Sequence, residues 1–336
     1  MRKDSFSTFK KVLAKATTIS IITHWGPDGD AMGSSLGLYH YLKSKNKKVK
    51  VIVPNEYPNF LKWLPGNNTV LVHEREPKKA NSFIHQSDVI FTLDFNSFKR
   101  IEQLGLEVEK TKAIKILIDH HQQPDDYANY YFHDVKSCST CELVYEFICG
   151  VDNKKVIDKK IASCLYTGIM TDSGSFRFPS TTSNTHRIVA DLIDKGADNA
   201  AIYNAVNDDN SKERLKLLGY CLNKMEVLDE YHTAYISLSE EDQKKYNVQK
   251  GDTEGIVNYP LSIEGIRFSA FFLEMKDEIK ISFRSKGNFD VNKFARKHFN
   301  GGGHLNAAGG EAHIRLDEVV TSFVSLLPEY KDQLLK

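Results

Sequence analysis

The residues best suited to chemistry are Asp119, His120 and His121, a carboxylate followed by two imidazoles. They end the apolar run of residues 113–118, which has the character of a buried strand. Adjacent histidines behind a carboxylate are poor choices for an apolar core, whereas imidazole nitrogen and carboxylate oxygen are ligands of transition metals. The triplet therefore predicts a metal site to which other segments supply further ligands.

A second group of candidate ligands, His24, Asp28 and Asp30, follows the apolar stretch of residues 18–23. Glycine and proline separate these residues, so we expect them to lie in a loop without regular structure. Their side chains suit manganese, zinc or iron. Taken alone, the segment is equally typical of a hydrophilic turn.

Two more carboxylates lie at the ends of predicted elements. Asp94 ends the strand-like run 89–94, so it occupies the same relative position as His24 and Asp119 do after their own strands. Asp172 follows helically spaced apolar residues and is expected near a helix C-terminus. The helix dipole disfavours an anion there, and a nearby metal would resolve that conflict.

The C-terminal half carries two features that could bind phosphate. Gly301, Gly302 and Gly303 precede His304, and glycine N–H groups can approach an anion closely, with added field if a helix starts just afterwards. Polar residues alternate with apolar ones over residues 279–284, so one strand face is polar and Arg284 could grip a phosphate bidentately. An exposed edge strand with a solvated arginine is the alternative for Arg284.

Strand and helix patterns alternate through the first half, which predicts an α/β fold with a doubly wound parallel sheet. Residues 191–229 read as a helical connector, and the remainder as a smaller α/β domain with a mixed sheet. We therefore expect a metal-binding catalytic domain over 1–190, a helical linker over 191–229 and a substrate-binding domain over 230–336. Strands are predicted at 18–23, 49–53, 89–94, 114–119, 233–238, 266–275 and 279–284, and helices at 31–44 and 315–327.

Composition restricts the class of protein. With 45 basic and 44 acidic residues the formal net charge is +1, and no continuous basic track for long nucleic acid is evident. No apolar run approaches the length of a membrane span and no signal-like segment begins the chain, so we expect a cytoplasmic protein without membrane attachment. Cys138 and Cys141 could suggest a zinc pair, but a capping box of Ser139 with Glu142 at a helix start is the better interpretation.

Taken together, these motifs resemble the DHH phosphoesterase superfamily, in the subgroup with a DHH-associated C-terminal domain. The match covers nearly the whole chain, with five motifs in order. Within the superfamily the chain is most similar to the stand-alone nano-RNases and 3′-phosphoadenosine-5′-phosphate phosphatases, also called exopolyphosphatase-related proteins. The matching segments are His24-x3-Asp28-x-Asp30, Asp94, Asp119-His120-His121, Asp172 and Gly301-Gly302-Gly303-His304.

The resemblance implies a role for each residue. It implies two Mn²⁺ ions that share a bridging carboxylate and activate a water between them. His121, Asp119 and Asp94 form the implied catalytic group, with His121 facing the substrate phosphate and Asp119 orienting a histidine. The implied metal ligands are His24, Asp28 and Asp94 for one ion, and Asp30, Asp94, His120 and Asp172 for the other. The implied substrate-binding residues are Arg284, Ser285, Gly301, Gly302, Gly303 and His304.

The expected activity is manganese-dependent hydrolysis of short oligoribonucleotides and of 3′-phosphoadenosine-5′-phosphate. A phosphodiesterase for cyclic or linear dinucleotides would use the same residues and stays open. A polyphosphatase fits less well, because a domain built around a nucleotide end would have no use. A nucleotide-binding module without catalysis also fits less well, because no implied metal ligand is lost. Long nucleic acid and membranes are not expected partners, and a homodimer is expected only by analogy with relatives that dimerise through the DHH domain.

Overall fold

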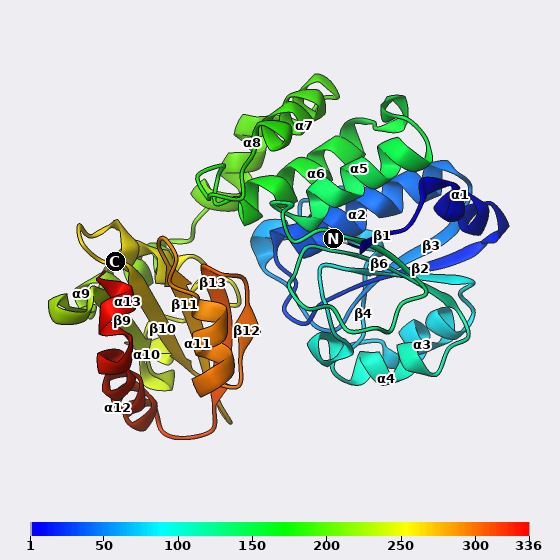
Figure 1. Cartoon of the computed structure of the whole chain (residues 1–336). Coiled ribbons are helices and arrows are strands. Elements are labelled where there is room, and N and C mark those ends of the chain that lie inside the picture. Colours follow the sequence, from blue (N-terminus) through cyan, green and yellow to red (C-terminus); the bar gives the residue numbers. More distant parts are fainter. Residues whose placement is uncertain (1, 336) are drawn as a thin grey trace. The chain divides into compact units, whose positions relative to one another are not determined.

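A computed structural model describes residues 2–335 of the chain. The chain folds into two compact units, the first ending at Asp209 and the second beginning at Asn210. Each unit combines helices with one main sheet, coloured from blue to green in the first and from green to red in the second (Figure 1). The predicted α/β fold, with a large parallel-rich sheet and a smaller mixed sheet, is confirmed.

The first unit is built on a seven-stranded sheet in the order β1-β7-β6-β5-β2-β3-β4. Neighbouring strands are parallel except for the edge pair of β1 with β7. The strands are β1 (Arg2–Lys3), β2 (Thr18–Thr23), β3 (Lys48–Val53), β4 (Leu71–Val72), β5 (Val89–Leu93), β6 (Ile114–Asp119) and β7 (Tyr130–His133).

Helices cover both faces of this sheet because its strands bury apolar residues on both sides. Ile21 and Phe91 join the core beneath α1, α2, α5 and α6, whereas their neighbours Ile22 and Ile90 join the core beneath α3 and α4. The helices are α1 (Phe6–Lys15), α2 (Gly29–Ser44), α3 (Pro77–His85), α4 (Gln103–Glu109), α5 (Thr140–Val151), α6 (Lys159–Asp172), α7 (Ser183–Asp194) and α8 (Asn199–Tyr203).

The sheet order has a functional consequence at β2. Strand β3 lies on one side of β2 and β5 on the other, so the direction in which successive strands are added reverses there. Ligands of open α/β sheets bind at such a switch point, outside the carboxyl ends of the strands. The segments after β2, β5 and β6 therefore meet at one edge of the sheet.

The expectation that residues 24–30 form an irregular loop is wrong for its last two members. Helix α2 begins at Gly29, and Asp30 lies in its first turn. The Asp28 side chain causes this early start because it accepts hydrogen bonds from the N–H groups of Asp30 and Ala31, as an N-cap residue does.

The second unit is built on a six-stranded sheet in the order β12-β13-β11-β10-β9-β8. Among the described strands of this unit, only β9 and β10 pair in parallel. The strands are β8 (Glu226–Leu228), β9 (Thr233–Leu238), β10 (Phe268–Glu274), β11 (Ile279–Ser285), β12 (Gly302–Gly303) and β13 (Ala307–Ala312). The helices are α9 (Lys212–Asn223), α10 (Glu240–Lys245), α11 (Val291–His298), α12 (Leu316–Leu326) and α13 (Lys331–Leu334).

Apolar residues of this sheet also divide between two faces. Phe272 of β10 packs in a phenylalanine-rich core with residues of α11 and α12, whereas Phe271 packs with residues of α9 on the other face. On the face of Phe271, the positions contributed by β11 and β13 include Ser282, Arg284 and Gly309. This part of the sheet is therefore polar or small where the neighbouring strands are apolar.

Within residues 191–229, α8 belongs to the first unit and α9 to the second, and the linker and the domain limits expected at 190 and 230 stay predictions. One sequence expectation meets a different structure here. No helix starts directly after the three glycines, since the chain instead forms a hairpin of β12 with β13. Because glycine has no side chain and alanine only a methyl group, the backbones of these two strands can approach closely.

The described part of the chain, residues 2–335, contains no helix that is both long enough and apolar enough to cross a membrane. The longest, α2, has 16 residues and contains the buried polar side chains of Ser34 and Ser35.

Close packing of α2, α5 and α6 yields a test of the first unit. A methyl group at Gly168 would overlap the Cys141 Sγ atom and lie 2.8 Å from Asp30 Oδ1. Gly168→Ala should therefore lower the free energy of unfolding by about 1–3 kcal/mol, measured by urea denaturation. Gly219→Ala in α9 is the matched control, because nothing lies within 4 Å of its added methyl group and it should stabilise by about 0.4–1 kcal/mol. Equal stability of the two variants would contradict this packing.

Candidate metal centre

Residues at the carboxyl ends of three adjacent strands form one part of the centre. Strands β6, β5 and β2 are neighbours and parallel, so their carboxyl ends lie side by side. His24 follows β2, Asp94 follows β5, and Asp119 ends β6 immediately before His120. The sequence-predicted ligands after these strands are therefore brought together by the topology of the sheet.

Asp94 leaves its strand in an unusual backbone conformation. Its φ of 64° lies in the left-handed region, where a residue with a side chain costs of order 1 kcal/mol. Aspartate tolerates this region better than most residues because its short side chain can form local hydrogen bonds. Thr140 Oγ1 donates to Asp94 Oδ1 over 2.8 Å. Strained backbone of this kind is concentrated at functional sites.

His24, Asp28 and Asp94 form the first group of potential ligands. His24 Nε2 lies 3.5 Å from Asp94 Oδ2 and 3.8 Å from Asp28 Oδ2. The other ring nitrogen, Nδ1, is 2.9 Å from the carbonyl oxygen of Trp25, which can only accept a hydrogen bond. This contact assigns the proton to Nδ1 in the neutral ring and turns the lone pair of Nε2 toward the carboxylates.

Asp30, His120 and Asp172 form the second group. His120 Nε2 lies 3.3 Å from Asp172 Oδ2 and 3.9 Å from Asp30 Oδ2. Its Nδ1 is 3.1 Å from the carbonyl oxygen of Ser137, so Nε2 again faces the carboxylates. Asp172 is the last residue of α6, as predicted. The helix dipole disfavours its negative charge there, and the neighbouring His120 ring compensates for this.

Asp94 connects the two groups because each of its oxygens faces a different histidine. Oδ2 is the oxygen near His24, whereas Oδ1 lies 3.6 Å from His120 Nε2. Within each group, the candidate ligand atoms all lie within 4.8 Å of one another. Nitrogen and oxygen donors without a thiolate fit ions such as manganese. The cluster of histidines and aspartates could therefore hold metal, and Asp94 faces both groups.

Burial and neighbouring charges shift the pKa values of several residues of the centre. Burial would lower the pKa of His24, but hydrogen bonds with Asp28 and Asp94 raise it to about 10. Burial opposes ionisation of Asp94, yet the neighbouring histidines hold the pKa of this carboxyl below its usual range. Burial and the adjacent carboxylates raise the pKa of Asp30. Such a concentration of buried carboxylate favours cations.

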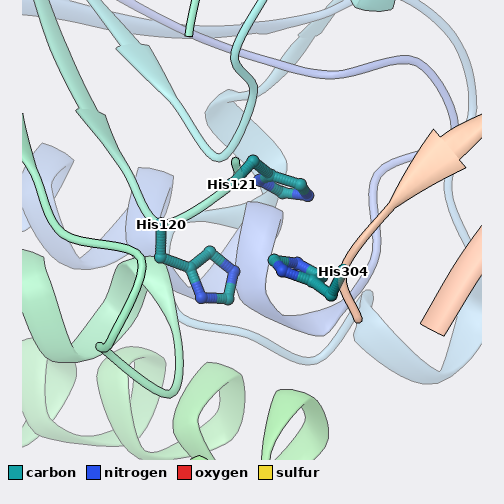
Figure 2. Close-up of side chains that lie close together, drawn as sticks. All are labelled: His120, His121 and His304. Atoms are coloured by element: carbon teal, nitrogen blue, oxygen red, sulfur yellow. The ribbon is translucent and has the colours of Figure 1, made fainter. Parts of the chain in front are cut away.

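His121 and Asp119 form a separate pair beside this centre. His121 Nδ1 lies 2.7 Å from Asp119 Oδ1 and 3.7 Å from Asp94 Oδ1. Asp119 is completely buried. The backbone carbonyl of His121 accepts a hydrogen bond from His133 Nε2 over 2.7 Å. Figure 2 shows the rings of His120 and His121 on the segment after β6, with ring centres 5.1 Å apart and planes at 79°.

The N-terminus of α5 contributes residues that the sequence interpretation missed. The N–H groups of Thr140 and Cys141 donate to Asp30 Oδ2 and Oδ1 over 2.6 and 2.9 Å. The first turn of a helix carries unpaired N–H groups and a favourable field for an anion. Asp30 and Asp94 are thus both held by one helix end.

A signal for this helix end was present in the sequence. The predicted capping box is half formed, because Ser139 caps the N–H of Glu142 over 3.0 Å. The Glu142 carboxylate instead accepts the N–H of Cys138 over 3.2 Å, so the reciprocal contact expected with Ser139 is absent. The capping box thus located the start of α5. The N–H groups in the first turn of this helix have no partner within the helix, so a buried carboxylate could have been expected beside them.

The predicted substrate residues Arg284 and Ser285 end β11 in the second unit. Arg284 Nη1 donates to the carbonyl oxygen of Phe283 over 2.9 Å. Ser285 is buried, and its hydroxyl donates to the carbonyl oxygen of Phe289 and accepts from Asn306 Nδ2. Ser285 therefore supports the turn after β11.

The three glycines have a local structural role. The N–H groups of Gly301 and Gly303 donate to the carbonyl oxygen of Ala295 and to Asn292 Oδ1, so these two are already engaged. A side chain at Gly301 would overlap Gly309. His304 lies in the turn after β12, where its N–H donates to the carbonyl oxygen of Ala307 over 2.7 Å.

Comparison with known proteins identifies the chain's family. The model of the DHH family, N-terminal domain, matches residues 18–169, and that of the DHHA1 domain matches residues 229–330. A probable bifunctional oligoribonuclease and PAP phosphatase of Streptococcus mutans is 31% identical over 313 residues, which cover 91% of this chain and 94% of the relative. The chain belongs to the DHH family. It is a hydrolase acting on phosphoester bonds, which confirms the predicted class of enzyme.

Two further similarities bear on fold and substrate. The crystal structure of an exopolyphosphatase-related protein from Bacteroides fragilis has a TM-score of 0.94 and 44% identity, over 98% of this chain and 97% of that one. A cyclic-di-AMP phosphodiesterase of Bacillus subtilis is 25% identical over 340 residues, covering 96% of this chain but 49% of the longer relative.

The shared position of Asp94 gives a direct test. Asp94→Asn should bind fewer metal ions per chain and lose more than about a hundredfold in turnover, because a bridging ligand serves both ions. Asparagine also accepts the left-handed backbone, so the fold should persist by circular dichroism. Normal metal content with more than a few per cent of turnover would reject the bridging role.

A second test concerns Thr140, which we infer to position Asp94. Thr140→Val removes the hydroxyl but preserves the shape, and should weaken manganese binding about 10–100-fold in a calorimetric titration. Thr140→Ser retains the hydroxyl and should restore most of the affinity. If both variants bind manganese as the wild type does, the hydroxyl has no positioning role.

Proposed function

We propose that this chain is a manganese-dependent phosphoesterase that hydrolyses short oligoribonucleotides and 3′-phosphoadenosine-5′-phosphate. The observation that carries this proposal is the pair of ligand groups that meet at Asp94. It is supported by the 31% identical relative from Streptococcus mutans, whose name describes both activities.

The residues present suit two ions. His24, Asp28 and Asp94 would hold the first, and Asp30, Asp94, His120 and Asp172 would hold the second. Two divalent ions bound there would lower the pKa of water and neutralise charge on the phosphoryl oxygens.

Side chains of the protein would bind the substrate and stabilise the transition state. Asp119 fixes His121 through the 2.7 Å hydrogen bond at Nδ1, so the opposite edge of the ring carries the atom that meets substrate. In this proposal His121 donates a hydrogen bond to a phosphoryl oxygen as negative charge develops in the transition state. Arg284 would bind a second phosphate, with His304 and the glycines at 301–303 completing the substrate-binding group.

Charge supports a short substrate. Long nucleic acid is held by many phosphate contacts along a basic track, and affinity then falls steeply with salt. This chain has a formal net charge of +1. The groups proposed to bind phosphate suffice for two or three phosphates.

Hydrolysis of cyclic or linear adenine dinucleotides is the second candidate. It is favoured by the similarity to the cyclic-di-AMP phosphodiesterase of Bacillus subtilis, which spans 96% of this chain. The same ligands and the same histidine would serve either substrate.

The test is a panel of substrates assayed with the purified full chain and manganese. It contains diadenylate, cyclic di-AMP, 3′-phosphoadenosine-5′-phosphate, polyphosphate and an RNA of about 24 nucleotides at physiological salt. We expect diadenylate and the bisphosphate to be hydrolysed fastest, the long RNA far more slowly, and the rate on diadenylate to depend weakly on salt. Chelator should abolish activity, and manganese should restore it best.

Three outcomes would contradict parts of the proposal. Equal or faster processing of the long RNA on a denaturing gel would reject the short-substrate assignment. A marked preference for cyclic di-AMP would favour the second candidate. Full activity with magnesium alone would contradict the assignment of manganese, because histidine ligands suit magnesium poorly.

A further inference from the structure

Two cations of the second unit lie opposite each other where β10 and β11 meet. In this antiparallel pair, Phe268 is the partner of Ser285, and Ser269 is the partner of Arg284. The register continues one step further, since the N–H of Lys286 donates to the carbonyl oxygen of Arg267 over 2.8 Å. Directly opposed residues of antiparallel strands have Cβ atoms about 5 Å apart, so both side chains can contact one small ligand.

These side chains line an open pocket of about 330 Å³, together with Gly265, Ile266 and Gly287. Gly287 has a φ of 68°, and an added Cβ atom there would lie 3.9 Å from Arg267 Nη1. Glycine at this position keeps a side chain away from the guanidinium group. Space for a ligand is therefore left beside both cations.

Neither cation is neutralised by the protein. Among residues 2–335, no carboxylate lies within ion-pair distance of Arg267 or Lys286, and neither side chain donates a hydrogen bond. Lys224 and Lys331 of the same unit do have acidic partners, Asp242 and Glu230, at 2.8 and 2.7 Å. Two unpaired cations that share a pocket favour an anion.

The charge of the pair indicates which anion. A terminal phosphate carries about −1.5 to −2 at neutral pH, whereas a phosphodiester carries a single negative charge. Arg267 and Lys286 together carry two positive charges. Lys286 follows the end of β11 and is two residues beyond Arg284 in the chain. The pocket thus lies close along the chain to the residue already proposed to bind substrate phosphate.

We propose that Arg267 and Lys286 bind the terminal phosphate of a short oligonucleotide, as a subsite distinct from the group that is hydrolysed. This inference rests on the proposed function for the identity of the substrate. It makes the second unit selective for phosphorylated ends, a property that the metal centre does not require.

The experiment compares two ligands that differ by one phosphate, diadenylate with and without a 5′-phosphate. Their affinities for the full chain are measured by calorimetry in the presence of chelator, so that no hydrolysis is needed. The wild type should bind the phosphorylated form more tightly. Arg267→Gln/Lys286→Gln should weaken its binding about tenfold, the loss expected for a charge-assisted contact, while the affinity for the unphosphorylated form stays unchanged.

Lys216→Gln/Lys276→Gln is the matched control, because it removes two positive charges at exposed positions of the same unit. It should bind both ligands as the wild type does. An equal affinity of the wild type for the two ligands, or an equal loss in the control, would overturn the subsite. Selective binding without hydrolysis in manganese would reject the proposed function and leave the subsite standing.

Discussion

Repulsion among buried carboxylates is the constraint on which the first unit depends. Asp30, Asp94 and Asp119 are each at most 2% exposed, and the charge of Asp94 acts on both of the others. Such charges are costly to bury unless hydrogen bonds or cations compensate them. The fold compensates them with imidazoles after β2 and β6, with the amides of α5 and with the Thr140 hydroxyl. The remaining negative charge is what makes the centre suited to metal ions.

The sequence predicted the parts of this arrangement that depend on local patterns. Apolar runs located β2, β5 and β6, and each run ended at or next to a polar residue of the candidate metal centre. Because parallel strands place their carboxyl ends at one edge, the strand pattern alone is enough to expect that His24, Asp94 and Asp119 meet. The position of Asp172 was predictable for a similar reason, since helical spacing located the end of α6.

Contacts between elements could not be predicted in the same way. Thr140 lies 46 residues from Asp94, and its neighbour Cys141 lies 111 residues from Asp30, so no local pattern links them. The helix expected directly after the glycines at 301–303 illustrates an error of the opposite kind. Their composition suggested an anion nest before a helix, but hydrogen bonds to Ala295 and Asn292 and close contact with β13 hold them in a hairpin. Composition alone does not separate a ligand-binding glycine from one required by packing.

The charges of the two units suggest that they contribute to binding by different routes. Without metal, the carboxylates of Asp28, Asp30, Asp94 and Asp172 would repel a phosphate, so anion binding at the first unit should depend on cations. Arg267, Arg284 and Lys286 carry fixed positive charge in the second unit and need no metal. In the proposed scheme, a nucleotide can therefore bind the second unit without metal, whereas only the metal-loaded first unit can act on it. Recognition and hydrolysis would then be separable by chelation.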